Sequence, residues 1–134
     1  DSDARDWPAL TAELEVIRAQ GRTPVLFSSR GERSGLSPQQ QRQLASAMAQ
    51  VVLGLEPPLG YVIAKGGTTS LTLLAEGLGF QQLRLLGQLQ PGLSIVQPEQ
   101  PHGRFGALPV VTFPCNLGDQ DSLRRCWQQL EQLR

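Results

Sequence analysis

Three short polar segments hold the residues whose types and spacing could bind a ligand. The central one, Lys65 to Ser70, reads Lys-Gly-Gly-Thr-Thr-Ser and follows a short apolar run. Glycine lets backbone amides approach a ligand closely, and hydroxyls at a helix start add hydrogen-bonding groups beside the free N–H groups. This pattern is typical of a phosphate-binding turn, although Lys65 precedes the glycines and the segment is therefore not a Walker A motif. The alternative is a plain strand-to-helix turn capped by threonine.

The two other segments also follow apolar runs. In the first, Ser29 could donate to a nucleotide or simply begin a turn, and in the third, Asn116 and Gly118 suit positive-φ positions beside Cys115. Lys65, the only lysine of the chain, either faces a phosphate or reaches water from a strand end. The candidate ligand-binding residues are Ser29, Lys65, Gly66, Gly67, Thr68, Thr69, Ser70, Cys115, Asn116 and Gly118.

The chain offers little with which to do covalent chemistry. It contains no HExxH, DxD or GxSxG motif, and its one histidine, His102, lies in a Pro/Gly-rich stretch without a catalytic partner at a telling spacing. We therefore predict no catalytic residue and no metal-ligand set. A nucleophilic Cys115 is a weaker alternative, because no nearby charge would stabilise its thiolate. Cys126 is expected in the core of a terminal helix.

Composition excludes several classes of protein. Twelve basic residues balance twelve acidic ones in 134 residues, so nothing in the net charge favours binding to nucleic acid or to a membrane surface. No apolar run approaches the ~20 residues that a spanning helix needs. Two cysteines without a paired-motif spacing fit a reducing, cytoplasmic setting. The length suits one domain over residues 1–134.

Periodic apolar positions predict helices that alternate with strands. Leu10, Leu14 and Ile17 mark the first helix, and Ser37 with Gln40 has the spacing of a capping box. Each later helix is also expected to have an inward apolar face. For the second helix this face is Leu44, Met48, Val51, Val52 and Leu55; for the third it is Leu71, Leu74, Ala75 and Leu78; and for the last it is Leu123, Trp127 and Leu130.

Five strands are predicted between these helices. They cover Thr23–Ser29, Tyr61–Ala64, Leu83–Leu89, Leu93–Val96 and Leu108–Phe113. The alternation favours an α/β fold, a layered domain with a largely parallel sheet flanked by helices. In such sheets ligands bind beyond the carboxyl ends of the strands, which is where all three polar segments are expected.

Taken together and in order, four motifs resemble the four-carbon acid sugar kinase family. They are Ser-Ser-Arg, Lys-Gly-Gly-Thr-Thr-Ser, Gly-Gln-Leu-Gln-Pro-Gly-Leu and Phe-Pro-Cys-Asn-Leu-Gly-Asp. The resemblance is to the C-terminal, nucleotide-binding domain of these two-domain enzymes. It implies a kinase that uses ATP, with Mg²⁺, to phosphorylate threonate, erythronate or a 3-oxo-tetronate.

The resemblance also implies roles for particular residues. Ser29, Gly66 to Thr69 and Cys115 to Gly118 would contact ATP, and the segment Gly87 to Gly92 would shape the adjoining wall. Where the family has Pro-Gly-Asn, this chain has Cys115 between the proline and the asparagine.

The family's acid-sugar site and catalytic acid belong to an N-terminal domain of the same polypeptide, which is the expected partner. Without it we expect this chain to be inactive as a kinase. The absence of an initial methionine fits an excised domain, and a stand-alone protein is the alternative. A degenerate domain that senses a nucleotide or binds a partner is the second functional hypothesis. Self-association is left open.

Overall fold

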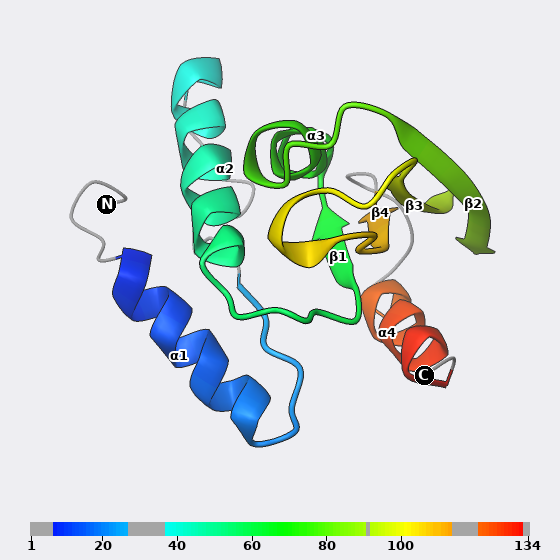
Figure 1. Ribbon diagram of the computed structural model, residues 1–134, viewed down its shortest axis with the longest axis horizontal. Helices are drawn as coiled ribbons and strands as arrows, with labels where there is room; N and C mark the ends of the chain where they lie inside the picture. Colours follow the sequence, from blue (N-terminus) through cyan, green and yellow to red (C-terminus); the bar gives the residue numbers. More distant parts are fainter. Residues whose placement is uncertain (1–6, 27–36, 91, 114–120, 133–134) are drawn as a thin grey trace.

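The computed structural model describes residues 7–26, 37–90, 92–113 and 121–132. Within these ranges a mixed sheet lies between helical layers (Figure 1). The helices are α1 (Trp7–Ala19), α2 (Pro38–Leu53), α3 (Gly67–Thr72), its π-helical continuation η2 (Leu73–Gly77), the short 3-10 turn η3 (Gly103–Phe105) and α4 (Ser122–Gln132). The strands are β1 (Val62–Lys65), β2 (Leu83–Gln90), β3 (Leu93–Pro98) and β4 (Val110–Phe113).

The sheet has the strand order β1-β4-β3-β2. Only β1 and β4 run parallel, whereas β4 with β3 and β3 with β2 are antiparallel. The predicted α/β layered class is confirmed, and the expectation of a largely parallel sheet is wrong. The reason is the short connection between Gln90 and Leu93, where Gly92 has φ = 87°; so short a link can only join antiparallel neighbours.

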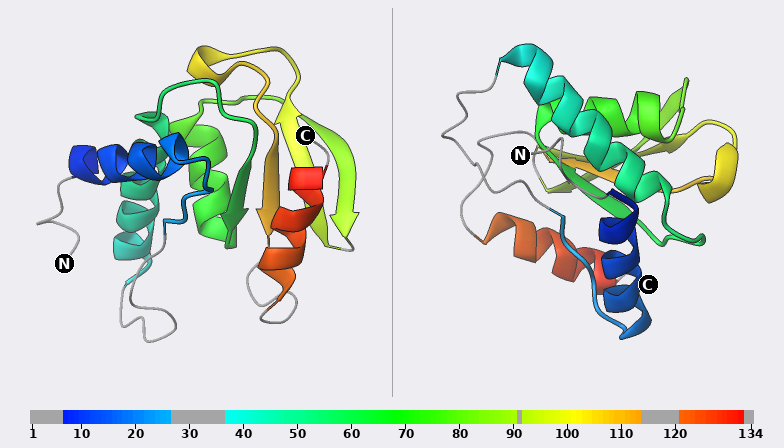
Figure 2. Two further views of the ribbon diagram at one scale, coloured as in Figure 1. Left: turned by 90° about the horizontal axis from the view of Figure 1, so that it is seen from below. Right: turned by 90° about the vertical axis from the view of Figure 1, so that its left-hand side faces the viewer.

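Each face of the sheet has its own hydrophobic cluster. On one face Leu73 and Leu74 of the α3–η2 helix pack with Ala64 and Val110, and α2 adds Ala49. On the other face the cluster joins Leu93, Val111, Phe113, Cys126 and Leu130, so α4 covers that side. The right-hand view in Figure 2 shows α2 and α3 on one side of the strands and α4 on the other.

Helix α2 begins as its sequence predicts. Ser37 Oγ accepts from the Gln40 amide at 3.1 Å, and Gln40 Oε1 accepts from the Ser37 amide at 2.9 Å. Helix α1 packs against the far end of α2 through Leu14, Val51 and Leu55. The predicted capping box is confirmed, and it holds the first turn of α2 where that helix faces α3.

Several expected inward positions are wrong. Leu71 is 67% exposed and Ala75 is also exposed, whereas the expected Leu74 and Leu78 are buried together with Leu73. On α4, Leu123 and Trp127 are partly exposed, and the Trp127 indole N–H donates to Thr23 Oγ1 at 2.9 Å.

The predicted strand Thr23–Ser29 is not found in the four of its residues that the structure describes. Residues 23–26 are irregular and Val25 is 65% exposed, while residues 27–29 lie outside the described ranges. Among the helices of the described residues, none has the length and apolar character that crossing a membrane requires.

Candidate functional site

The bend between β1 and α3 depends on a glycine. Gly66 has φ = 101° and ψ = 143°, a backbone conformation that side-chain-bearing residues rarely adopt. Its N–H donates to the Phe113 carbonyl at 2.7 Å, and its own carbonyl accepts from the Ser70 amide at 3.0 Å. The bend is therefore fixed to β4 on one side and to the first turn of α3 on the other.

Helix α3 starts without a side-chain cap, because its N-cap residue is Gly66. The amides of Gly67, Thr68 and Thr69 stand in the first turn, where an α-helix provides no internal acceptor. Thr68 also has an exposed side chain. Such an arrangement can donate several hydrogen bonds to an anion placed at the bend.

Ser70 has a structural partner. Its side chain is buried, and its hydroxyl donates to the Ala64 carbonyl at 3.1 Å. This bond ties the first turn of α3 to β1. Ser70 thus positions the bend, and its proton is directed away from any ligand at the helix start.

The Lys65 side chain lies on the other side of the sheet from α3. Its ammonium is 4.7 Å from the centroid of the Phe113 ring, a cation–π distance, and Phe113 belongs to the cluster beneath α4. In this structure Lys65 is thus a strand-end side chain that covers an aromatic ring, and its contact with a phosphate stays a prediction.

Three chain segments leave the sheet at one rim. Lys65 pairs with Phe113 at the carboxyl ends of the parallel strands β1 and β4. Ser94, near the start of the antiparallel β3, pairs with Thr112, so the β2–β3 connection lies at the same rim. The bend and the residues that flank segment 114–120 are therefore neighbours. Ser29, Cys115, Asn116 and Gly118 lie outside the described residues, and their contacts with a ligand stay predictions.

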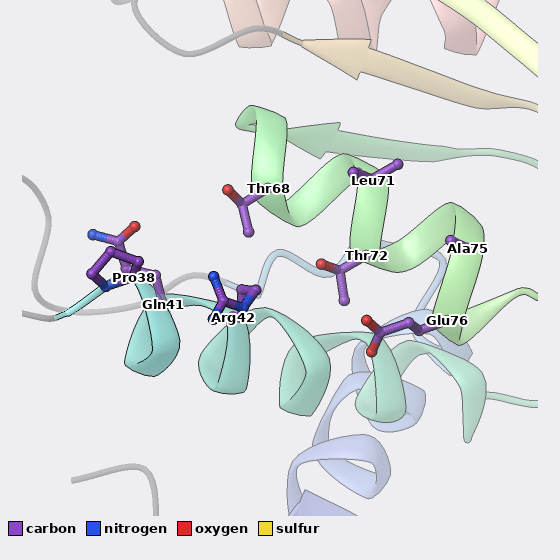
Figure 3. A pocket seen from close by; sticks show the side chains of 8 residues that line it. All are labelled: Pro38, Gln41, Arg42, Thr68, Leu71, Thr72, Ala75 and Glu76. Carbon is purple, nitrogen blue, oxygen red and sulfur yellow. The ribbon is translucent and has the colours of Figure 1, made fainter.

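A cleft opens between α2 and α3 next to the bend. It is open to solvent and has a volume of about 400 Å³, within the range of small-molecule sites. At the far end the helices meet closely, since a Cβ at Gly77 would lie 3.0 Å from that of Ala49. The cleft is lined by Pro38, Gln41, Arg42, Thr68, Leu71, Thr72, Ala75 and Glu76 (Figure 3).

Sequence reasoning missed the α2 side of this cleft. Gln41 and Arg42 stand on a helix full of exposed polar residues, and no motif distinguishes them. Only the packing of α2 on α3 shows that they border the same space as Thr68.

The remaining candidates stand apart from the rim. His102 belongs to the β3–β4 connection at the opposite end of the sheet, where its ring meets Phe80 edge-on at 6.2 Å. Cys126 is fully buried, and burial raises the pKa of its thiol. Within the described ranges, no three His, Cys, Asp or Glu side chains gather in a way that could hold a metal ion.

Comparisons with known proteins find solved structures with a similar fold. A solved structure from Bordetella bronchiseptica, described as a domain of unknown function with bound citrate and as a domain-swapped dimer, is 29% identical with a TM-score of 0.67. It matches 96% of this chain but only 30% of its own. A second crystal form, again a citrate-bound domain-swapped dimer, has a TM-score of 0.60 at 29% identity, over 95% of this chain and 31% of that one.

This chain thus spans about a third of the length of the solved structures that it matches. No curated protein matches it. The family model described as "nucleotide-binding C-terminal domain" matches residues 1–123. Since that match covers most of the chain, the protein belongs to the family of nucleotide-binding C-terminal domains.

Proposed function

We propose that this chain binds ATP and forms the nucleotide-binding part of a kinase whose acceptor is a hydroxyl of a four-carbon acid sugar. The family match supports nucleotide binding. The order of the four sequence motifs supports the acid-sugar class, of which threonate, erythronate and 3-oxo-tetronates are the candidate substrates. The reaction would take place in the cytoplasm, with Mg²⁺ accompanying ATP.

One observation matters most for the nucleotide. The uncapped start of α3 follows a glycine bend at the rim where β1 and β4 end, so its amides face outward without an acceptor in the helix. Phosphate oxygens bound there would accept from the amides of Gly67, Thr68 and Thr69 and gain from the helix dipole. Ser29 and residues 115–118 would complete the site.

The acceptor sugar and the catalytic acid would belong to an N-terminal domain of a longer polypeptide. The solved structures that match this chain are about three times as long, which supports a second domain. Phosphoryl transfer depends on positioning both substrates and on stabilising charge around them. We therefore expect the 134-residue chain to bind ATP without transferring its γ-phosphate. Because the matched structures are domain-swapped dimers, a homo-oligomer is part of the proposal.

A charge placed at the start of α3 tests the site without unfolding it. In Thr68→Asp, the new carboxylate would repel phosphate and weaken ATP binding by about tenfold or more. The same carboxylate should preserve or raise helix stability, by about 0.3–1 kcal/mol, because it complements the dipole. Calorimetric titration with MgATP measures the binding, and thermal unfolding measures the stability.

Gln39→Asp is the matched control. Gln39 is the second residue of α2, as Thr68 is of α3, and it does not line the cleft. This variant should bind MgATP like the unmodified chain. Absence of binding heat in the unmodified chain would reject the proposal, and equal losses in both variants would remove the α3 bend from it.

A further inference from the structure

A positive side chain would strengthen the binding of a polyphosphate at the bend, and Lys65 does not supply it on the α3 side. The bend itself contributes amides and hydroxyls only. Lys65 places its ammonium over the Phe113 ring, and Phe113 packs with Cys126 and Leu130 beneath α4. Since α3 lies on the opposite face, with Leu73 and Leu74 against Ala64, this charge is directed away from the cleft.

Arg42 is the positive group that borders the cleft. Figure 3 shows its side chain on the α2 side of the cleft, on the side of Thr68. Thr68 directly follows the bend, so this end of the cleft is continuous with the uncapped start of α3. Arg42 and Thr68 thus border the same end of the cleft, next to the predicted phosphate site.

Arg42 is also uncommitted within the part of the chain that the structure describes. Its one acidic neighbour in the cleft is Glu76, whose carboxylate accepts from Ser46 Oγ at 2.9 Å. The ion pairs found among the described residues join Arg18 with Glu15 and Arg84 with Glu99. A guanidinium without a carboxylate partner favours a bound anion, because its planar fork can donate to two oxygens at once.

We propose that Arg42 is a phosphate-binding residue and that α2 supplies the cationic side of the nucleotide site. This inference rests on the proposed function and adds a second element to it. The ligand group is a polyphosphate, which nucleoside triphosphates and inorganic triphosphate share. Lys65 in turn is a structural residue that shields Phe113.

Three charge-neutralising variants test the assignment in the 134-residue chain. Arg42→Gln keeps a polar side chain but loses the charge, and we expect about a tenfold or greater loss of affinity for MgATP and for inorganic triphosphate. Lys65→Gln should stay within about twofold of the unmodified chain, because its ammonium is directed over the Phe113 ring and away from the cleft. Arg22→Gln should do the same, since a screened distant charge contributes little. Arg22 is the matched control because it is exposed and follows α1, which packs against the end of α2 that is far from Arg42.

Salt dependence and folding complete the test. Binding to the unmodified chain should weaken with added salt more steeply than binding to Arg42→Gln, because one ionic contact is missing in the variant. All three residues are exposed, so thermal unfolding should remain close to that of the unmodified chain.

The outcomes separate this inference from the proposed function. If Arg42→Gln binds like Arg22→Gln while Thr68→Asp still loses MgATP, the inference is overturned and the nucleotide site at the bend stands. An equal loss in Lys65→Gln and Arg42→Gln also overturns it, because the charge would then not be specific to the cleft. An unmodified chain that binds neither ligand overturns both proposals.

Discussion

Cys126 shows how a single side chain links the core to the pH dependence of stability. It lies fully buried between α4 and the sheet, with Phe113 and Leu130 in the same cluster. Burial disfavours the charged thiolate and raises the pKa of the thiol above its ordinary value of 9.0. The folded protein should therefore keep this thiol protonated at pH values where the unfolded chain begins to ionise.

We predict that ionisation of the Cys126 thiol lowers the free energy of unfolding as the pH rises above about 9. Below this pH the thiol is neutral in both states, so its contribution is complete and constant. As the pH rises through the unfolded and then the folded pKa, the unfolded chain loses its proton first and the free energy of unfolding falls. Urea unfolding from pH 7 to pH 10 should show a steeper decline in the unmodified chain than in Cys126→Ala. Equal declines would contradict the prediction.

The residues around the bend show where sequence reasoning about a site ends. The glycine-bearing turn at Gly66 could be predicted, because its composition requires a special backbone conformation. The orientation of its neighbours could not. Ser70 and Lys65 were equally good candidates by type, yet Ser70 donates to Ala64 and Lys65 covers Phe113. Side-chain direction depends on the sheet register and on α4, which local sequence does not encode.

At the scale of elements, helix α2 matters to the site through its first turn. Ser37 and Gln40 cap each other reciprocally, and this turn brings Gln41 and Arg42 to the cleft. Both halves of the capping box were predictable because they depend only on residues three positions apart.

We predict that Ser37→Ala lowers the free energy of unfolding by about 1 kcal/mol, the usual cost of losing an N-cap acceptor. Thermal or urea unfolding measures this loss. Ser37→Asp is the control: its carboxylate can accept from the same amide and complements the helix dipole, so stability should be retained. A Ser37→Ala variant as stable as the unmodified chain would show that the cap contributes nothing measurable.

Helix α3 with its π-helical continuation was predicted as a helix with an inward face that is half right. Leu74 and Leu78 are buried as expected, whereas Leu71 and Ala75 are exposed and Leu73 is buried. The observed and the expected faces both have helical spacing, so periodicity alone does not choose between them. The close approach of Gly77 to Ala49 of α2 marks the face that packs inward, and this contact joins two helices that are distant in sequence.

At the scale of the whole molecule, the layered α/β architecture could be predicted and the direction of the strands could not. Alternating strand and helix patterns indicated the layers. The antiparallel pairs arise because β2 and β3 form a hairpin and β3 returns beside β4. The parallel contact of β1 with β4 is the one that brings two predicted ligand-binding segments to the same rim.

The open edge of this sheet has a consequence for the whole chain. Strand β2 stands at the end of the strand order and pairs only with β3 among the described strands. Leu83, Leu85 and Leu86 are 40%, 64% and 49% exposed, and Arg84 is the only charged residue in the strand. Proteins usually protect edge strands with charges, because free N–H and C=O groups can pair with another chain. In the longer polypeptide that we propose, the second domain or a partner copy would cover this edge.

We therefore predict that the 134-residue chain self-associates through β2 as its concentration rises. Leu85→Lys should keep it monomeric, because association through β2 would bury the new ammonium, which costs free energy. The substitution removes no core packing, because the Leu85 side chain is already exposed in the single chain. Sedimentation velocity over a range of concentrations measures the association. Leu71→Lys is the matched control, because Leu71 is exposed to a similar degree on a helix that has no open backbone edge. If both variants suppress the self-association equally, the cause is general charge repulsion and not the β2 edge. If the unmodified chain stays monomeric at every concentration, the prediction of self-association through β2 is wrong.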